Sequence, residues 1–153
     1  MKFREIITCL AVASLIILGS CTPQPCYQIT NATVKADFFQ TGTGKSLIAD
    51  SVTLFGIGMD TSRIYSQATG LHVINIPLNP SSDSSSFYLK INNITDTVTF
   101  YYSSYTHLVS KECGYTYYFI LTRPVKHDKV LPDYNTINAV ISTVNEENVR
   151  IFY

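Results

Sequence analysis

Tryptophan is absent from this chain of 153 residues, and only 14% of the residues are charged. That charge content is too low for a coiled coil, and a hydrophobic content of 46% is too high for a disordered chain. The 11 basic and 11 acidic residues cancel and form no basic cluster, which argues against a nucleic-acid partner. The chain is rich in other aromatics, with 11 Tyr and 8 Phe, and these favour strands over helices. Its length suffices for one ordinary domain and not for two.

One long apolar run is present, and it lies at the start of the chain. Residues 6–18 are apolar apart from small or weakly polar positions, and Lys2 and Arg4 precede them. The run is shorter than the roughly 20 apolar residues of a membrane-spanning helix. A positive start followed by a short apolar core is typical of a secretory signal. We therefore predict residues 1–20 as a signal helix that is removed from the mature protein.

The end of this signal predicts a lipid anchor. Leu18-Gly19-Ser20-Cys21 resembles the lipobox of bacterial lipoproteins, in which the signal is cleaved before the cysteine and the thiol accepts diacylglycerol. The alternative is an ordinary signal peptide with a chance cysteine. Thr22 follows Cys21 and no acidic run comes after it, a pattern that by resemblance to known sorting rules favours the outer membrane and its periplasmic side. The expected partner is thus the membrane itself, through a lipid on Cys21.

The cysteines predict one disulfide. Of the four, Cys9 leaves with the signal and Cys21 is the lipid acceptor, so Cys26 and Cys113 remain in an oxidising compartment. The simplest outcome is a Cys26–Cys113 bond, and the alternatives are two buried free thiols or a bridge between molecules. We expect the bond to hold the start of the ordered chain against the body of the domain. Two isolated cysteines without a nearby histidine do not indicate a metal site.

The rest of the chain is predicted to be all-β. Pro23 and Pro25 disfavour a helix, so residues 21–33 are interpreted as a tether to a single domain of residues 34–153. About eight short strands separated by turn signals indicate one antiparallel β-sandwich, Ig-like or related, with a small β-barrel as the alternative. Residues 81–86 and 123–136 are expected to be exposed loops. The predicted strands are 34–39, 51–55, 71–78, 87–92, 97–105, 113–122, 137–142 and 149–152, with a further short piece at 64–65.

Two tyrosine-rich strands are the ambiguous feature of the sequence. In residues 113–121 one alternating face is almost wholly apolar or aromatic and is expected to point inward; it contains Cys113, Tyr115, Tyr117, Phe119 and Leu121. The tyrosines of the two strands either form an exposed platform for a sugar or peptide or divide between the core and cross-strand pairs, and the second arrangement is favoured. These tyrosines are Tyr101, Tyr102, Tyr105, Tyr115, Tyr117 and Tyr118.

Several stretches resemble a family of small uncharacterised lipoproteins from Bacteroidetes, catalogued only as a domain of unknown function. The most specific is Val109-Ser110-Lys111-Glu112-Cys113-Gly114, and the C-terminal Asn148-Val149-Arg150-Ile151-Phe152-Tyr153 also fits. The family places a cysteine shortly after the lipidated one, which supports the pairing of Cys26 with Cys113. The resemblance implies a fold and a location, and it implies no activity. The other similar stretches are 52–59, 76–79 and 96–102.

Motifs for catalysis are weak. Gly42-Thr43-Gly44-Lys45-Ser46 is similar to the end of a phosphate-binding loop, but Phe39 stands where that motif needs its first glycine, so a hairpin tip is favoured. His72, His107 and His127 are isolated in the sequence. We therefore predict no catalytic, metal or cofactor residues, no cofactor and no enzyme activity. The favoured function is a non-catalytic accessory or protein-interaction module of the cell envelope. The alternative is a glycan- or peptide-binding module that uses the tyrosine-rich strands, and the partner's identity stays open.

Overall fold

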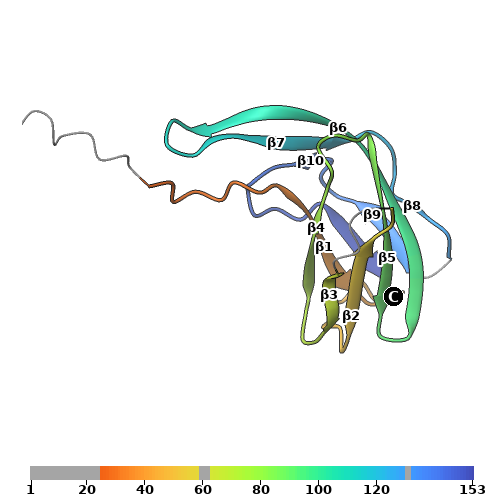
Figure 1. The fold of residues 1–153 in the computed structure, drawn as a ribbon. Coiled ribbons are helices and arrows are strands. Elements are labelled where there is room, and N and C mark those ends of the chain that lie inside the picture. Colours follow the sequence, from red (N-terminus) through yellow and green to blue (C-terminus); the bar gives the residue numbers. More distant parts are fainter. Residues whose placement is uncertain (1–24, 59–62, 130–131) are drawn as a thin grey trace, which may run out of the picture.

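The computed structural model describes residues 25–58, 63–129 and 132–153. The predicted signal at residues 1–20 and the lipid acceptor Cys21 lie outside the described residues. The described residues form eleven strands in two sheets and contain no helix, so none of them forms a helix able to span a membrane (Figure 1). The strands are β1 (Thr33–Phe39), β2 (Val52–Gly56), β3 (Arg63–Ala68), β4 (Val73–Pro77), β5 (Ser84–Ile91), β6 (Ile94–Ser110), β7 (Gly114–Leu121), β8 (Lys126–His127), β9 (Asp133–Thr136), β10 (Val140–Ile141) and β11 (Val149–Phe152).

The smaller sheet joins the two ends of the domain. Its four strands lie in the order β4-β1-β11-β9. The first strand β1 and the last strand β11 pair in parallel, with Ala36 opposite Val149, and the outer pairs β1–β4 and β11–β9 are antiparallel. The predicted sandwich was purely antiparallel, and this pair is a correction. Both strands enter the sheet from the same end, and the chain between them is long enough for the crossover that parallel pairing needs.

The larger sheet has seven strands along β10-β7-β6-β5-β2-β3, with β8 also paired to β6. All of its ladders are antiparallel. The turn between β5 and β6 is tight, because Ile91 pairs with Ile94 and Asn92 adopts a positive φ of 52°. The side chains of β5 alternate between buried and partly exposed, as expected for a strand with one face on a core.

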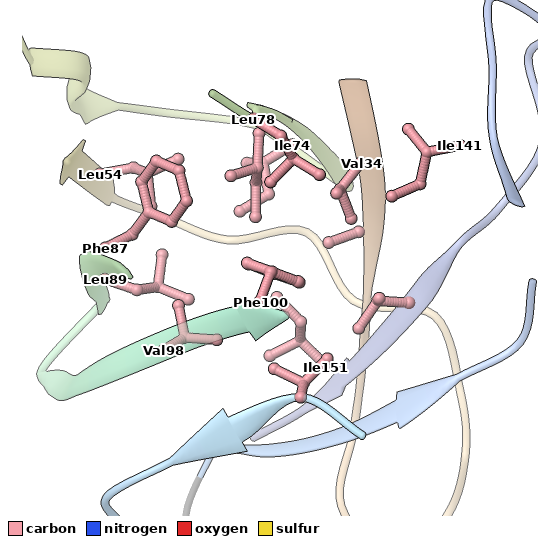
Figure 2. Packing of buried hydrophobic residues seen from close by; sticks show 14 of the residues in the cluster. Val34, Leu54, Ile74, Leu78, Phe87, Leu89, Val98, Phe100, Ile141 and Ile151 are labelled. Atoms are coloured by element: carbon pink, nitrogen blue, oxygen red, sulfur yellow. The ribbon is translucent and has the colours of Figure 1, made fainter. Parts of the chain in front are cut away.

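The core lies between the two sheets. Phe87 of β5 and Phe100 of β6 meet edge to face with ring centroids 6.1 Å apart, and both are buried. Figure 2 shows Val34 and Ile151 of the smaller sheet in the same cluster as Leu54, Phe87 and Phe100 of the larger one. The prediction of an all-β fold is confirmed, and two sheets around one core fit a β-sandwich or a small barrel.

Three segments differ from the sequence prediction. Residues 123–136, expected to be a loop, contain β8 and β9, and the described residues form eleven strands and not about eight. The serine-rich segment 81–86 contains the start of β5. Ser85 lies on the buried face of this strand and is 3% exposed, and its hydroxyl is satisfied by the Tyr102 hydroxyl. The strand expected at 137–142 is reduced to β10, Val140–Ile141. Short polar strands were missed because sheet pairing, and not hydrophobic pattern, fixes them.

Candidate functional site

The larger sheet sends out a two-stranded projection at one end. Strand β6 is 17 residues long, while β5 pairs with it only as far as Tyr101. From Tyr102 onward, β6 pairs with β7 alone, up to Ser110 opposite Gly114. Burial alternates along β6 until Tyr102, and all positions from Ser103 to Leu108 are exposed. Residues 103–118, here called the arm, therefore extend beyond the body (Figure 1).

Tyr102 fixes the base of the arm. It is 2% exposed, and its ring meets Phe119 edge to face at 5.3 Å between centroids. Its hydroxyl donates to the Asn79 carbonyl at 2.9 Å, accepts from the Asn79 N–H at 3.1 Å, and lies 2.6 Å from the Ser85 hydroxyl. One buried hydroxyl thus joins β6, β5 and the turn after β4 at the point where the arm leaves the body.

The tip of the arm is joined to the tether by the predicted disulfide. Cys26 is bonded to Cys113, which confirms the pairing. Cys113 lies in the turn between β6 and β7, where the Ser110 hydroxyl accepts from the Cys113 N–H at 3.0 Å, and Gly114 has a φ of 71° that suits glycine. Our expectation that the bond holds the tether against the body is wrong: the bond holds the tether to the far end of the arm.

From Cys26 the tether runs back beside the arm to β1 (Figure 1). The Thr116 hydroxyl donates to the Thr30 carbonyl, which ties the middle of the described tether to β7. The side chains of Tyr27 and Ile29 are 85% and 65% exposed. The tether is therefore fixed at its two ends and once between them, with little buried surface of its own.

One face of the arm carries an aromatic cluster. His107 stacks on Tyr118 with ring centroids 4.2 Å apart and an interplanar angle of 15°, and Tyr105 meets Tyr118 edge to face at 6.0 Å. Tyr105 and Tyr118 are directly opposite across the ladder. The expected cross-strand tyrosine pair is therefore present, and His107 joins it. Ile120, 39% exposed, extends this face toward the body.

The other face of the arm is the outward extension of the β7 face that packs on the core, and here it is exposed to solvent. We expected this face to be buried along its whole length, but only Phe119 and Leu121 are buried, whereas Tyr115 is 74% and Tyr117 46% exposed. The alternation itself is present; no second sheet covers the outer half of the strand. Leu108, 47% exposed, lies opposite Tyr115 on this face.

A shallow apolar hollow lies where the arm, the tether and β4 meet. Its volume is about 240 Å³, and it is lined by Ala32, Leu78, Tyr117 and Phe119 among others. It holds no charged side chain within its lining. Apolar surface of this kind is suited to binding other apolar groups.

A buried carboxylate lies at the other end of β6 and holds a loop. Asp96 is 3% exposed, and its Oδ1 accepts from the N–H groups of Thr97 at 2.8 Å and Asp128 at 3.1 Å. Burial, and then the nearby Asp96 charge, raise the pKa of Tyr134 above its ordinary value. Nearby, His127 Nε2 lies 3.8 Å from Asp133 Oδ1. Among residues 25–58, 63–129 and 132–153, no three His, Cys, Asp or Glu side chains gather into a group suited to a metal.

The glycine-rich segment at 42–46 forms a hairpin tip, as predicted. The Gln40 N–H donates to the Lys45 carbonyl at 2.8 Å, and the Gly44 N–H donates back to the Gln40 carbonyl at 3.0 Å. Gly42 and Gly44 both adopt positive φ, 81° and 65°. The turn connects Phe39 to a bridge at Ser46, and no helix follows it within the described residues.

Comparison with known protein families gives a match over most of the chain. Residues 51–153 match a family of unknown function, DUF6452. The chain belongs to DUF6452. The match includes β2 to β11, and so the whole arm and Cys113, while the tether, Cys26 and β1 precede it. Neither the curated proteins nor the solved structures contain a significant match to this DUF6452 chain.

Sequence reasoning missed the arm as a unit. It predicted a strand over 97–105 and ended it eight positions short of Cys113, because hydrophobic alternation stops after Tyr102. A signal was present: residues 103–110 contain neither proline nor glycine, and Thr and Tyr continue the β-favouring composition up to the turn. The tyrosine hydroxyl that fixes the base of the arm had no such signal, because its partners are distant in sequence.

Proposed function

We propose that this DUF6452 chain is a lipoprotein of the bacterial cell envelope, attached to the outer membrane through Cys21 and facing the periplasm, and that it acts as a non-catalytic protein-interaction or accessory module. The lipobox-like Leu18–Cys21 segment and the resemblance to Bacteroidetes lipoproteins support the anchor. The Cys26–Cys113 disulfide supports an exported location, since such bonds persist in oxidising compartments.

The observation that carries the interaction role is the exposed arm. Tyr105 on one face and Leu108, Tyr115 and Tyr117 on the other are 41–74% exposed, although Tyr102 and the disulfide fix the arm at its two ends. Exposed apolar surface on an ordered element marks sites of contact with other molecules. The tyrosine–histidine cluster gives this surface a rigid shape at low cost in side-chain entropy.

The anchor is tested by fractionation. Cells expressing the full chain with Cys21→Ala are expected to release the protein from the membrane fraction into the soluble envelope fraction. A matched Cys9→Ala variant, altered within the predicted signal, is expected to stay on the membrane. Retention of the Cys21→Ala protein on the membrane at the wild-type level contradicts the anchor.

The interaction role is tested by crosslinking from defined positions. A photoreactive amino acid at Tyr105 on the arm is expected to give a discrete adduct in intact cells. The same group at Ile48, 66% exposed and adjoining the far end of β1, is the matched control and is expected to give none. Equal labelling patterns from both positions, or none from either, count against the arm as the contact surface.

A second function is supported by a separate observation. Tyr117 is 46% exposed and borders the apolar hollow beside the tether, an arrangement suited to an apolar side chain of a peptide or to a sugar face. If this function holds, at least one ligand in a panel of envelope glycans and peptides binds the protein. Tyr117→Ala is expected to lower the affinity for that ligand at least tenfold, while Tyr88→Ala is expected to leave it unchanged.

A further inference from the structure

We propose that the tip of the arm lies in the headgroup layer of the bilayer leaflet that holds the lipid anchor. This inference rests on the proposed lipoprotein function and deepens it by naming the occupant of one exposed surface. The surface, here called the tip patch, consists of Tyr27, Leu108 and Tyr115. Its occupant is the lipid interface and not a second protein.

The covalent path sets the distance. Cys21 precedes Cys26 by five residues, and an extended chain of that length spans at most about 18 Å. Because Cys26 is bonded to Cys113, a lipid on Cys21 keeps the arm tip within that distance of the acylated residue. Without the bond, the same anchor would first meet the core at Ala32, eleven residues away and up to about 40 Å along an extended chain. The disulfide therefore selects the tip of the arm as the part that is closest to the bilayer.

The side chains at this end suit a lipid interface. Tyr27 and Tyr115 are 85% and 74% exposed, the two most exposed large hydrophobic side chains of the described residues, and Leu108 is 47% exposed. Tyrosine favours the membrane interface because its ring enters the apolar region while its hydroxyl stays hydrated. Leu108 and Tyr115 are cross-strand partners and share one face, so they enter such a layer together.

The charges at the tip permit this contact. Lys111 and Glu112 lie side by side in the turn, so the turn adds no net charge. Contact with the leaflet thus depends on the aromatic and aliphatic side chains and not on attraction to anionic lipids. We expect the contact to be insensitive to salt for that reason.

The geometry also predicts a spacing. The eight β6 residues from Ser103 to Ser110 span about 24 Å at the rise of an antiparallel strand. An arm whose tip lies among the headgroups holds the sandwich away from the bilayer by a distance of that order. The Tyr105–His107–Tyr118 cluster then lies between membrane and body, where an envelope partner can reach it.

The absence of tryptophan makes the test direct, because each substitution to Trp creates a single fluorescent reporter. The lipidated mature protein carrying Tyr115→Trp is reconstituted into vesicles of phosphatidylethanolamine and phosphatidylglycerol. The matched reporter is Ile48→Trp at the opposite end of the domain. The lipids are brominated either close to the headgroup end of the acyl chain or close to its methyl end. Tyr27→Trp serves as a second tip reporter if Tyr115→Trp fails to fold.

The expected result is a blue-shifted emission from the tip reporter and quenching that is stronger with the shallow bromine than with the deep one. The Ile48→Trp emission is expected to stay unshifted and unquenched. Adding Cys113→Ser to the tip variant is expected to weaken the quenching, because the tip is then no longer held to the anchor. Raising the salt concentration is expected to leave it unchanged.

Two outcomes overturn the proposal and are distinct from failure of the anchor. The first is a tip reporter that stays unquenched although the anchor is intact. An intact anchor means that the protein floats with the vesicles and that its Cys21 peptide has the mass of a lipidated peptide. The second is a blue shift that depends on protein concentration and not on lipid, which assigns the tip patch to a second copy of the chain. Protein that does not float with the vesicles and has an unmodified Cys21 refutes the proposed lipoprotein, and the tip contact with it.

Discussion

Loss of the Cys26–Cys113 bond is expected to lower stability by less than its loop length suggests. The bond joins two residues that are 87 positions apart in the sequence. Closing a loop of that length lowers the entropy of the unfolded chain, which corresponds to a stabilisation of about 4.6 kcal/mol at 25 °C. That value assumes a native state whose order does not change when the bond is removed. Here both cysteines lie outside the sandwich core, one in the tether and one at the tip of the arm.

The native state also gains freedom when the bond is cut. Tyr27 and Ile29 are largely exposed, so residues 26–31 are expected to detach from the arm and move freely, while Ala32 stays packed in the core. The net effect is then the difference between closing an 87-residue loop and closing one of about six residues, which is about 2 kcal/mol. We therefore predict that Cys113→Ser lowers the free energy of unfolding by about 2 kcal/mol and not by 4.6.

Urea unfolding of the mature chain, followed by tyrosine circular dichroism, measures this difference. Cys21→Ser is the matched control, because it removes a cysteine outside the bond and should change stability by less than about 0.5 kcal/mol. Limited proteolysis of Cys113→Ser should cut residues 26–31 while the sandwich stays intact. A loss of 4–5 kcal/mol would refute the reasoning, since it would mean that the tether stays ordered without the bond.

Three further changes test the core, the base of the arm and a titrating strand residue. Phe100→Ala is expected to cost about 3–5 kcal/mol, because Phe100 is 1% exposed; a loss under 1 kcal/mol in urea unfolding contradicts the described packing. Tyr102→Phe is expected to cost about 0.5–1.5 kcal/mol, since it removes the hydroxyl that bonds Asn79 and Ser85, whereas the Asn79 N–H keeps the Ser85 hydroxyl and its carbonyl keeps the Ser82 N–H. Hydrogen exchange should quicken at the base of the arm, and unchanged exchange there contradicts that role. Burial and a nearby glutamate raise the pKa of Asp37, so the folded state binds its proton more tightly than the unfolded state does. Ionisation of Asp37 therefore lowers stability as pH rises through the folded pKa. Asp37→Asn is expected to raise the urea midpoint at neutral pH but not at a pH below the ordinary aspartate range. An equal rise at both pH values would contradict a raised pKa of Asp37.

The hydrophobic pattern predicted the parts of the fold in which two sheets face each other. Strands β1, β2, β5 and β11 were located within a few residues, because alternation is visible wherever one face is buried and the other is not. The disulfide followed from counting cysteines. Strands β8 and β9 were not predicted, since two to four polar residues that complete an edge carry no periodic signal.

The arm shows why the site could not be predicted from pattern alone. The same alternation runs through β7 from Tyr115 to Leu121, and the inward prediction holds only for Phe119 and Leu121. An apolar face shows that a strand can pack against another apolar surface. It does not show whether that surface belongs to the same chain or to another molecule. That information depends on where β5 begins, at Ser84, and the sequence around Ser84 is typical of a loop.

A two-stranded ribbon without a covering sheet is marginally stable in water, so the arm needs support beyond its ladder. The cross-strand contacts at Tyr105, His107 and Tyr118 contribute about 0.2–1 kcal/mol each, which is too little to resist fraying from the open end. Closing that end is the local role of Cys113. Under the proposed anchor, tension on the lipid enters at Cys26, passes through the bond into the β6–β7 ladder, and reaches the body at the Tyr102 hydroxyl and not at the first residues of β1. A pull along this path loads the whole ladder, whereas a pull on β1 would open the parallel β1–β11 pair from its end. With a lipid on Cys21, as proposed, this path directs the load through the arm and away from β1, the strand that pairs with the last strand of the domain.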